Sequence, residues 1–390
     1  MCKENKILEA LRVAEQNPLP LLRDEVYHLL QACSHEKDLS NARRIHSLMA
    51  ASNLHAVSVL SDHLIRLFGQ CQSLQDACDA FSLVPKRTVF TWNAISSAHM
   101  NLLKDYNALL LYAHMQKQGV NPNKVTFLFV LKACSNLNID ALEKYGRVIH
   151  HQILFLGNFS SEVAISNMLI HMYAKCGCLR EARSVFCGSD SENLRESGSG
   201  SRFQRDSISW SALISGYAQQ GQVHEALNVY SCMQRENVPN SVTFICILKA
   251  CGNRSALDEG RRVHKMIVDR GLLEKEIVLA TAIVDMYAKC GEMTNAKDML
   301  NSLSVQDVIS WNTLISGYIQ AGQCSEALDC MQRIYCECLS PDSVTFICIL
   351  KACGTIGGTN KGKQIHDKIR RRGLLEKDVT LGNALFGHVH

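Results

Sequence analysis

The residues of this 390-residue chain best suited to chemistry are its 18 cysteines, which could bind zinc or form disulfides. No two of them have the C-x-x-C spacing of a common zinc site. Instead, Cys33, Cys134, Cys251 and Cys353 follow apolar stretches in one recurring L-K/Q-A-C context, which indicates buried helix positions where cysteine acts as a small hydrophobe. We therefore predict free thiols in a reducing compartment, and neither a metal nor another cofactor.

Histidines also recur, but they do not gather. His46, His150, His264 and His366 occur once per repeated unit and far apart, which favours a role in helix packing over metal binding. The chain also lacks the H-x-E motif that serves a zinc-activated water as its acid and base. We therefore predict that the chain is not an enzyme.

Internal repetition is the strongest pattern in the sequence. The string SVTFICILKACG occurs unchanged at Ser241–Gly252 and at Ser343–Gly354. Trp92, Trp210 and Trp311 begin the related strings TWNAIS, SWSALISGY and SWNTLISGY. The large repeat spans about 101 residues and contains three smaller units of about 31 to 36 residues.

Each smaller unit predicts two short helices. In Val308–Asp342, SWNTLISGYIQAG forms one amphipathic helix that stops at Gly322, and SEALDCMQRIY forms a second with Ser325 as its N-cap. The Pro341-Asp342 pair then breaks the chain. Because a single hairpin cannot bury its apolar face alone, stacking predicts an all-α, right-handed α-solenoid superhelix of helix-turn-helix repeats with a long concave groove.

Composition narrows the class of protein further. Hydrophobic residues make up 47% of the chain, which excludes a disordered polymer. The net charge of +4 is too small for binding to duplexes by phosphate neutralisation alone. No apolar run reaches 18 residues, so we expect no membrane partner. Glutamates at positions 4, 9 and 15 make the first residues a poor secretory signal or transit peptide.

Three strings recur in fixed order: VISWNTLISGYIQAGQCSEAL, VTFICILKACG followed by GKQIH, and AIVDMYAKCGEMTNAK. They resemble the P, L and S motifs of the plant PLS subfamily of pentatricopeptide repeat proteins, from Arg23 to the end of the chain. The E and DYW extensions found at the C-terminus in that subfamily are lacking. The resemblance implies a mitochondrial or chloroplast protein, although no clear transit peptide is present.

The resemblance also divides the chain. Residues 1–22 form a helical leader or cap, and residues 188–205 form a flexible Ser- and Gly-rich insertion. Residues 379–390 are a truncated S repeat, typical of a fragment or a truncated gene product. Between them, the repeats are L 23–57, S 58–88, P 89–123, L 124–162, S 163–206, P 207–240, L 241–276, S 277–307, P 308–342 and L 343–378.

In the resembled family, the fifth and last residues of a repeat read the edge of one RNA base, and the second residue packs against the base faces. The expected pairs are Asn93 with Asn123 for a pyrimidine, Asn167 with Asp206 for U, Ser211 with Asn240 for A, Thr281 with Asp307 for G and Asn312 with Asp342 for U. Asn383 is the fifth residue of the truncated repeat. The expected base-sandwiching residues are Phe90, Ile208, Val278 and Ile309.

The L repeats depart from this scheme. Their fifth residues cannot bind a base edge, so we interpret these repeats as spacers of low selectivity; these residues are Tyr27, Leu128, Ile245 and Ile347. Asp62 with Thr88 is a pair that the scheme does not decode. The predicted partner is single-stranded RNA of sequence 5′-Y-N-U-A-N-G-U-3′, where Y is a pyrimidine and N is any base.

Structural explanations remain open for each of these residues. Asn, Ser and Thr near a helix start are often caps, and Asp at a repeat end often forms a turn. The three tryptophans could stack on bases, but a place in the core is favoured. The basic runs Arg43-Arg44, Arg261-Arg262 and Arg370–Arg372 could contact phosphates, but a solvated helix face is favoured.

Three functions remain in competition. The first is sequence-specific RNA binding in organellar RNA processing, for example as a specificity factor for C-to-U editing, with an editing enzyme or another RNA-processing protein acting in trans. The second is a scaffold for protein–protein interaction, since fold alone does not fix function. The third is a nonfunctional remnant of an editing factor. Paired polar positions in alternate repeats favour the first function.

Overall fold

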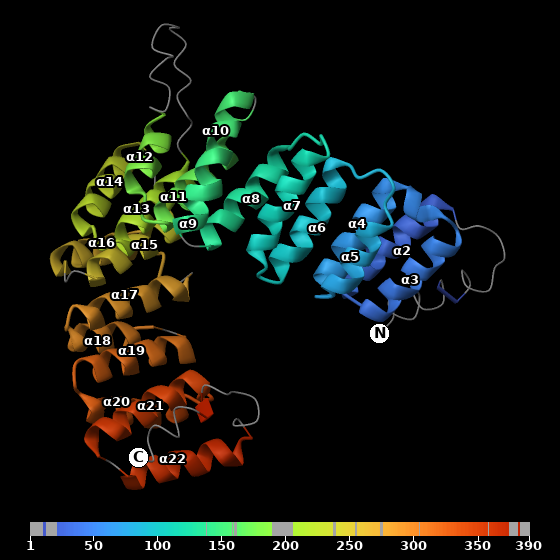
Figure 1. Ribbon diagram of the computed structural model, residues 1–390. Coiled ribbons are helices and arrows are strands. Elements are labelled where there is room, and N and C mark those ends of the chain that lie inside the picture. Colours follow the sequence, from blue (N-terminus) through green and yellow to red (C-terminus); the bar gives the residue numbers. More distant parts are fainter. Residues whose placement is uncertain are drawn as a thin grey trace, which may run out of the picture. The chain divides into compact units, whose positions relative to one another are not determined.

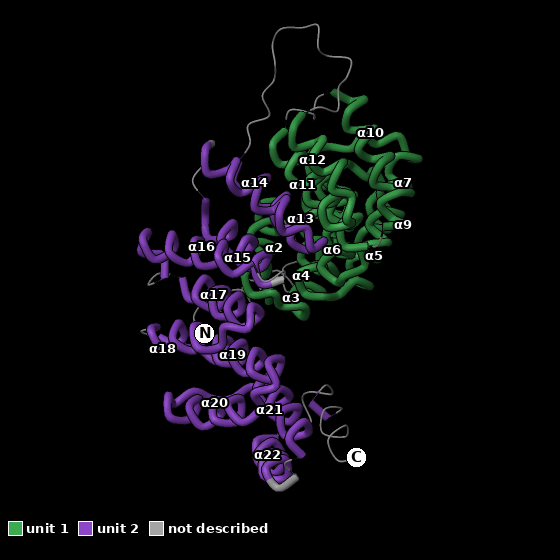
Figure 2. The backbone as a smooth tube through the Cα atoms, turned by 90° about the vertical axis from the view of Figure 1, so that its left-hand side faces the viewer, with its two compact units in different colours: residues 1–204 green, residues 205–390 purple. Residues whose placement is uncertain are grey.

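The computed structural model describes residues 11–12, 22–137, 139–157, 159, 162–188, 206–236, 239–253, 256–273, 276–303, 305–357, 359–373 and 381–382. The chain divides into two compact units, residues 1–204 and 205–390, which Figure 2 shows in different colours. Most of the predicted leader, the predicted insertion except Gly188, and most of the truncated repeat with Asn383 lie outside the described residues.

Unit 1 consists of successive helix pairs (Figure 1). Its helices are α2 (Arg23–Glu36), α3 (Leu39–Ala51), α4 (Ser58–Gln70), α5 (Leu74–Ser82), α6 (Val89–Asn101), α7 (Asp105–Lys117), α8 (Lys124–Asn136), α9 (Ile139–Ala141), α10 (Arg147–Leu156), α11 (Val163–Lys175) and α12 (Leu179–Cys187). A short 3-10 turn, Leu54–Ala56, precedes α4, and a π-helical turn, Leu142–Gly146, joins α9 to α10.

Unit 2 repeats the same arrangement. Its helices are α13 (Ser207–Gln219), α14 (Val223–Glu236), α15 (Ser241–Asn253), α16 (Leu257–Asp269), α17 (Ile277–Lys289), α18 (Met293–Asn301), α19 (Val308–Gln320), α20 (Cys324–Cys336), α21 (Ser343–Ile356) and α22 (Thr359–Arg371). The first helix of a pair packs against its own second helix and against the first helix of the next pair, as α17 does with α18 and α19. Within each unit, the predicted all-α solenoid of helix-turn-helix repeats is therefore confirmed.

The first helix of each pair starts where the sequence predicts that a motif starts. These helices are α2, α4, α6, α8 and α11 in unit 1, and α13, α15, α17, α19 and α21 in unit 2. Their shared register lets equivalent positions be compared, so positions are counted below from the first residue of each of these helices. The assignment of the repeats to P, L and S types stays a prediction.

The second helix of a pair starts earlier than predicted. Gly322 adopts a φ of 74°, which a residue without a side chain adopts readily, and the Gln323 amide then bonds to the Tyr318 carbonyl at 2.8 Å. Because this turn leads directly into a helix, α20 begins at Cys324 with Gln323 as its N-cap. The prediction that Ser325 is the N-cap was wrong, and Ser325 lies inside the first turn.

Aromatic residues at the fourth position fill the core. Trp92, Trp210 and Trp311 are almost fully buried, which confirms their predicted place between helices. Fully buried phenylalanines take the same position in the L repeats after the first, which has Val26 there, and small buried residues take it in the S repeats. The phenylalanines are Phe127, Phe244 and Phe346, and the small residues are Ser61, Ser166 and Ala280. From Trp92 onward, two fourth positions with a large aromatic side chain are followed by one with a small side chain in each stack.

The recurring histidines and cysteines are also structural. His150 and His264 each lie 3.0 Å from a tyrosine hydroxyl, that of Tyr173 and that of Tyr287. The four cysteines of the L-K/Q-A-C context are buried and free, as predicted. No group of three or more His, Cys, Asp or Glu side chains within the described ranges is placed to hold a metal ion. Among those same residues, no helix has the length and apolarity needed to cross a membrane.

Neighbouring first helices approach very closely where an S repeat meets a P repeat. A Cβ atom on Gly69 of α4 would lie 2.7 Å from the Cβ of Ala98 on α6. A Cβ atom on Gly317 of α19 would lie 2.6 Å from the Cβ of Ala288 on α17. Each contact pairs one glycine with one alanine, so the space between the two helices holds only one methyl group. The glycine lies in the earlier helix in unit 1, at Gly69, and in the later helix in unit 2, at Gly317.

This contact can be tested by exchanging the two residues. Alanine normally stabilises a helix relative to glycine, but Gly317→Ala should lower the free energy of unfolding by about 1–3 kcal/mol because the added methyl group overpacks the contact. The double variant Gly317→Ala/Ala288→Gly, which reverses the pair, should recover most of that loss in urea unfolding. Equal stability of Gly317→Ala and the wild type would contradict the close contact.

Candidate nucleic-acid interface

Within each unit, the second residues of most first helices form a row of exposed apolar side chains. The four predicted base-sandwiching residues are 57–64% exposed; they are Phe90, Ile208, Val278 and Ile309. Val59, Val125, Val242 and Val344 take the same position in other repeats and are 43–57% exposed, although the sequence analysis did not name them. Exposed apolar residues at one position of successive repeats indicate a binding surface, because nothing in the fold itself requires them there.

Beneath this row, polar side chains from two neighbouring repeats meet. The Asn93 side chain donates from Nδ2 to Asn123 Oδ1 at 3.0 Å and accepts at Oδ1 from the Thr126 hydroxyl at 2.9 Å. Asn123 Oδ1 also accepts from the Thr126 backbone N–H at 3.0 Å, which makes Asn123 the N-cap of α8. We call this set a junction: the fifth and last residues of one repeat with the third residue of the next.

The Asn312 junction has the same geometry. Asn312 Nδ2 donates to Asp342 Oδ1 at 3.0 Å, and the Thr345 hydroxyl lies 2.7 Å from Asn312 Oδ1 and 2.8 Å from Asp342 Oδ1. The Thr345 backbone N–H donates to the same Asp342 oxygen at 2.8 Å. The two predicted partners, fifth and last residue, are therefore brought into direct contact here, as they are at Asn93 and Asn123.

Where the fifth residue is Ser or Thr, the third residue of the next repeat bridges the pair. The Ser211 hydroxyl lies 2.9 Å from the Thr243 hydroxyl, which in turn donates to Asn240 Oδ1 at 2.9 Å. Thr281 likewise lies 2.9 Å from the Ser310 hydroxyl, which donates to Asp307 Oδ1 at 2.5 Å. These shorter side chains do not reach the last residue themselves, so the bridging hydroxyl completes the junction.

The remaining predicted pair is divided between the two units. Asn167 is half-buried on α11 in unit 1, and Asp206 belongs to unit 2, where its side chain accepts from the Ser209 backbone N–H at 2.8 Å and caps α13. Their mutual distance therefore stays untested. Asn383 lies outside the described residues.

The two members of a junction differ in burial. Asn93, Ser211 and Asn312 are at most 8% exposed, whereas Asn240 and Asp342 are exposed and Asn123 and Asp307 are half-buried. The bonds described above use one oxygen of each last residue and do not use its second polar atom, Nδ2 in Asn or Oδ2 in Asp. The last residue therefore both caps a helix and presents a polar atom. The fifth residue bonds to it directly at Asn123 and Asp342, and through the bridging hydroxyl at Asn240 and Asp307.

The third residues were missing from the sequence analysis. They are Thr91, Thr126, Ser209, Thr243, Ser310 and Thr345, each after a repeat of P or S type. In repeats that follow an L repeat, the third residue is apolar, as in Leu60, Ile165 and Leu279. A comparison of third positions along the sequence would have revealed this alternation. Repeats that follow a P or S repeat have a polar third residue, which can bond to the polar fifth residue before it, and repeats that follow an L repeat do not.

Boundaries after an L repeat lack the junction. Glu162 and Glu276 precede α11 and α17 without capping them by a side chain. Glu162 instead pairs with Lys124 at 2.5 Å, and Glu276 accepts from the Ser241 hydroxyl at 2.6 Å, so the last residue bonds to the first residue of its own repeat. The apolar fifth residues of the L repeats are half-buried.

Electrostatics at the Asn312 junction favour a charged last residue. Partial burial acts to raise the pKa of Asp342, but hydrogen bonds from the Thr345 backbone N–H, the Thr345 hydroxyl and Asn312 outweigh it. The pKa of Asp342 therefore lies below its ordinary value. The ionised carboxylate is the form that the junction stabilises.

Three arginines of the basic runs form ion pairs. Arg43 pairs with Asp76 of the next helix pair at 2.8 Å, and Arg262 pairs with Glu259 at 2.5 Å. Arg261 lies 3.6 Å from Glu292. The three arginines lie on second helices with side chains 48–73% exposed, which agrees with the interpretation of a solvated face for these residues. Arg372 instead donates to the Pro341 carbonyl oxygen at 3.3 Å.

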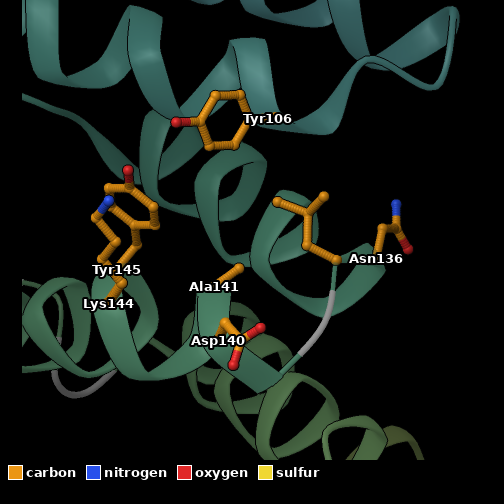
Figure 3. Close-up of a pocket in the computed structure, with 7 residues that line it drawn as sticks. Tyr106, Asn136, Asp140, Ala141, Lys144 and Tyr145 are labelled. Carbon is orange, nitrogen blue, oxygen red and sulfur yellow. The ribbon is translucent and has the colours of Figure 1, made fainter.

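A separate cavity of about 710 Å³ lies in unit 1. It is lined by Tyr106, Asn136, Leu137, Asp140, Ala141, Lys144 and Tyr145, and Figure 3 shows Tyr106 across the cavity from Ala141 and Asp140. Its lining includes none of the predicted base-recognition or base-sandwiching residues. Sequence reasoning gave no sign of it, because it depends on the π-helical turn after α9.

Comparison with known proteins identifies the repeats. The family model described as PPR repeat family matches residues 205–253 and 306–355, the pentatricopeptide repeat domain matches residues 73–137, and the PPR repeat matches residues 165–192. The chloroplastic pentatricopeptide repeat-containing protein CRR2 of Arabidopsis thaliana is 33% identical over 95% of this chain and 55% of its own length. The chain belongs to the pentatricopeptide repeat family.

Other family members extend the comparison. A mitochondrial pentatricopeptide repeat-containing protein of Arabidopsis thaliana is 30% identical over 88% of this chain and 38% of its own length. The chain thus spans about half or less of the length of these curated relatives. Among solved structures, the pentatricopeptide repeat protein PPR10 from maize, in complex with an 18-nucleotide psaJ RNA element, aligns with a TM-score of 0.62 at 15% identity. The alignment covers 87% of this chain and 52% of PPR10, which supports the same fold.

Acid should weaken the Asn312 junction of this pentatricopeptide repeat chain. Because the pKa of Asp342 is lower when folded than when unfolded, its ionised form contributes stability that is present above the unfolded value of about 4 and is lost as the pH falls through the folded value. The free energy of unfolding should therefore fall more steeply in the wild type than in Asp342→Asn between pH 7 and pH 3.

Urea unfolding at several pH values measures this difference. The variant Thr345→Val serves as the control, because it removes one of the donors to Asp342 while preserving the shape of the side chain. In that background the effect of Asp342→Asn should depend less on pH. Parallel pH profiles for the wild type and Asp342→Asn would show that the junction does not favour the charged form.

Proposed function

We propose that this chain binds single-stranded RNA in a sequence-specific manner, with about one base per repeat. The observation that carries the proposal is the row of exposed apolar second residues above junctions whose last residues present a polar atom. Such a row offers surfaces for base faces, and the last residue offers a hydrogen-bonding group for the base edge. The proposal treats the chain as a binding protein without catalytic activity.

The polar atom of the last residue gives the selectivity a physical basis. Asn can donate from Nδ2, and a donor matches the ring nitrogen of adenine or cytosine, which accepts. Ionised Asp can only accept, and an acceptor matches the ring N–H of uracil or guanine. This division agrees with the bases expected at Asn123, Asn240, Asp307 and Asp342, and so supports the target 5′-Y-N-U-A-N-G-U-3′.

Known relatives support this direction. PPR10 is a pentatricopeptide repeat protein solved with RNA, and the curated relatives are described as chloroplastic or mitochondrial. We infer that this chain acts on organellar RNA, for example as a specificity factor for C-to-U editing with an enzyme or another RNA-processing protein in trans. In that case the purified chain alone should leave a substrate RNA unconverted.

A protein scaffold is the competing function, and the junctions speak against it. A peptide-binding groove would not require a polar fifth residue to meet an Asn or Asp at the last position, as Asn93 meets Asn123 and Asn312 meets Asp342. The L boundaries, which lack both features, show that the solenoid packs without them. The polar junctions are therefore better explained by recognition of a ligand with one polar edge per repeat.

Removing an exposed aromatic side chain tests the proposed surface. Phe90→Ala should weaken binding to 5′-Y-N-U-A-N-G-U-3′ by about 1–3 kcal/mol, because a stacking surface for a base is lost. Phe155→Ala is the matched control, since Phe155 is 91% exposed on α10 and is not at a second position. Fluorescence anisotropy should show that Phe155→Ala binds the single-stranded RNA as tightly as the wild type does. The wild type and Phe155→Ala should both bind duplex RNA more weakly than single-stranded RNA. An equal loss for both variants would contradict the proposed surface.

Exchanging one recognition pair tests the code. The double variant Ser211→Asn/Asn240→Asp converts the pair expected for A into the pair found at Asn312 and Asp342. Its preferred base at that position should change from A to U by about tenfold in relative affinity, because the ring-nitrogen contact changes from donor to acceptor. Binding to RNAs with each of the four bases at that position measures the change. An unchanged preference for A would refute the proposed reading of this repeat.

A further inference from the structure

Asp62 occupies the fifth position of the first S repeat, on α4, where the other P and S repeats have Asn, Ser or Thr. Its side chain takes part in a junction: Thr91 is the third residue of the next repeat, and its hydroxyl donates to the Asp62 carboxylate. Thr88, the last residue, caps α6 by accepting from the Thr91 backbone N–H. Asp62 therefore stands where Asn93 and Asn312 stand in their junctions.

One atom sets this junction apart. Oδ1 of Asp62 is buried and has no hydrogen-bond partner, and the whole residue is only 6% exposed. In the equivalent Asn93 and Asn312, both ends of the side-chain amide are bonded. A buried carboxylate oxygen without a donor costs free energy, so this site would gain from a ligand that supplies one.

The buried surroundings of Asp62 also favour a ligand that donates hydrogen bonds to its carboxylate. Burial raises the pKa of Asp62, and the opposing effects of the Thr91 hydroxyl, Arg66 and His63 do not fully offset it. The free protein therefore holds this carboxylate in surroundings that penalise its charge. Further N–H donors at Oδ1 would relieve that penalty.

We propose that Asp62 selects guanine in the bound RNA, at the position immediately 5′ of the pyrimidine read by the next repeat. This inference rests on the proposed RNA-binding function. It extends the target to 5′-G-Y-N-U-A-N-G-U-3′.

The chemistry of the four bases leads to guanine. An ionised carboxylate accepts hydrogen bonds and donates none. Guanine presents two adjacent donors on its Watson–Crick edge, N1–H and the N2 amino group. Uracil presents one donor between two carbonyl oxygens, and adenine and cytosine each place an accepting ring nitrogen beside their amino group. Guanine alone can give the carboxylate two donors without turning an acceptor towards it.

The flanking residues place the base correctly. Val59 lies three residues before Asp62 on the same helix face, and Phe90 directly precedes Thr91. Both are second residues and both are 57% exposed. A base between these two side chains would direct its edge to the junction beneath them, where the unpaired oxygen lies.

The experiment compares four eight-base RNAs that share the Y-N-U-A-N-G-U core and differ only in having G, A, C or U at the first position. The full chain should bind the G-containing RNA at least about fivefold more tightly than each of the other three, as expected for a bidentate base contact. Asp62→Asn and Asp62→Ala should lose this preference while retaining affinity for the seven-base core. The matched control is Asp79→Asn on α5, whose exposed carboxylate accepts from Gln75 and which should keep the preference.

Each outcome of this experiment either supports or overturns the assignment of guanine to Asp62. Equal binding of the four RNAs by the wild-type chain would overturn the assignment. This comparison needs no variant, so it stands even if a substitution at Asp62 impairs folding. Loss of selectivity for the core over a scrambled core would overturn the proposed function itself, which is a separate measurement. A preference for G that survives in Asp62→Ala would assign it to another residue.

Discussion

At the boundaries after P and S repeats, this molecule depends on the hydrogen bond that the last residue of one repeat accepts from a backbone N–H in the first turn of the next helix. At Asn123 and Asp342 a single oxygen caps the helix, receives the third-residue hydroxyl and receives the amide of the preceding fifth residue. The bond therefore fixes where a helix starts, how two repeats meet and which polar atom remains for a ligand. Stability and recognition share one side chain, so a change in either affects the other.

This sharing explains why capping and base recognition could not be separated from the sequence. Asn, Asp, Ser and Thr near a helix start are what a cap requires, and they are also what a base edge requires. In the structure, capping uses one oxygen of the last residue, and under the proposed function its second polar atom would contact the base. The structure also shows that Asn93 and Asn312 are buried supports as well as candidate readers, which is a feature that residue type alone does not indicate.

The fold was largely predictable, because the repeats that follow a P or S motif begin after a capping residue and most repeats fill the fourth position with an aromatic or a small side chain. These local signals, together with the recurring motifs, give the starts of the first helices and the buried place of Trp92, Trp210 and Trp311. The failure at Ser325 is equally local, since the turn at Gly322 and not a capping side chain decides where α20 begins. Contacts between repeats, such as the one from Thr126 to Asn93, join residues about one repeat apart and so escape any argument from neighbouring residues.

The reversed Gly and Ala contacts have a consequence for engineering. Designers who recombine repeats treat each as an interchangeable part, but Gly69 and Ala98 in unit 1 match one another as Ala288 and Gly317 do in unit 2. Placing residues 58–88, the S repeat with Gly69, before residues 308–342, the P repeat with Gly317, would bring two glycines together and leave a void. The opposite exchange would bring two alanines together and force the helices apart. The smallest transferable block of this chain is therefore an S and P pair, cut at a boundary after an L repeat.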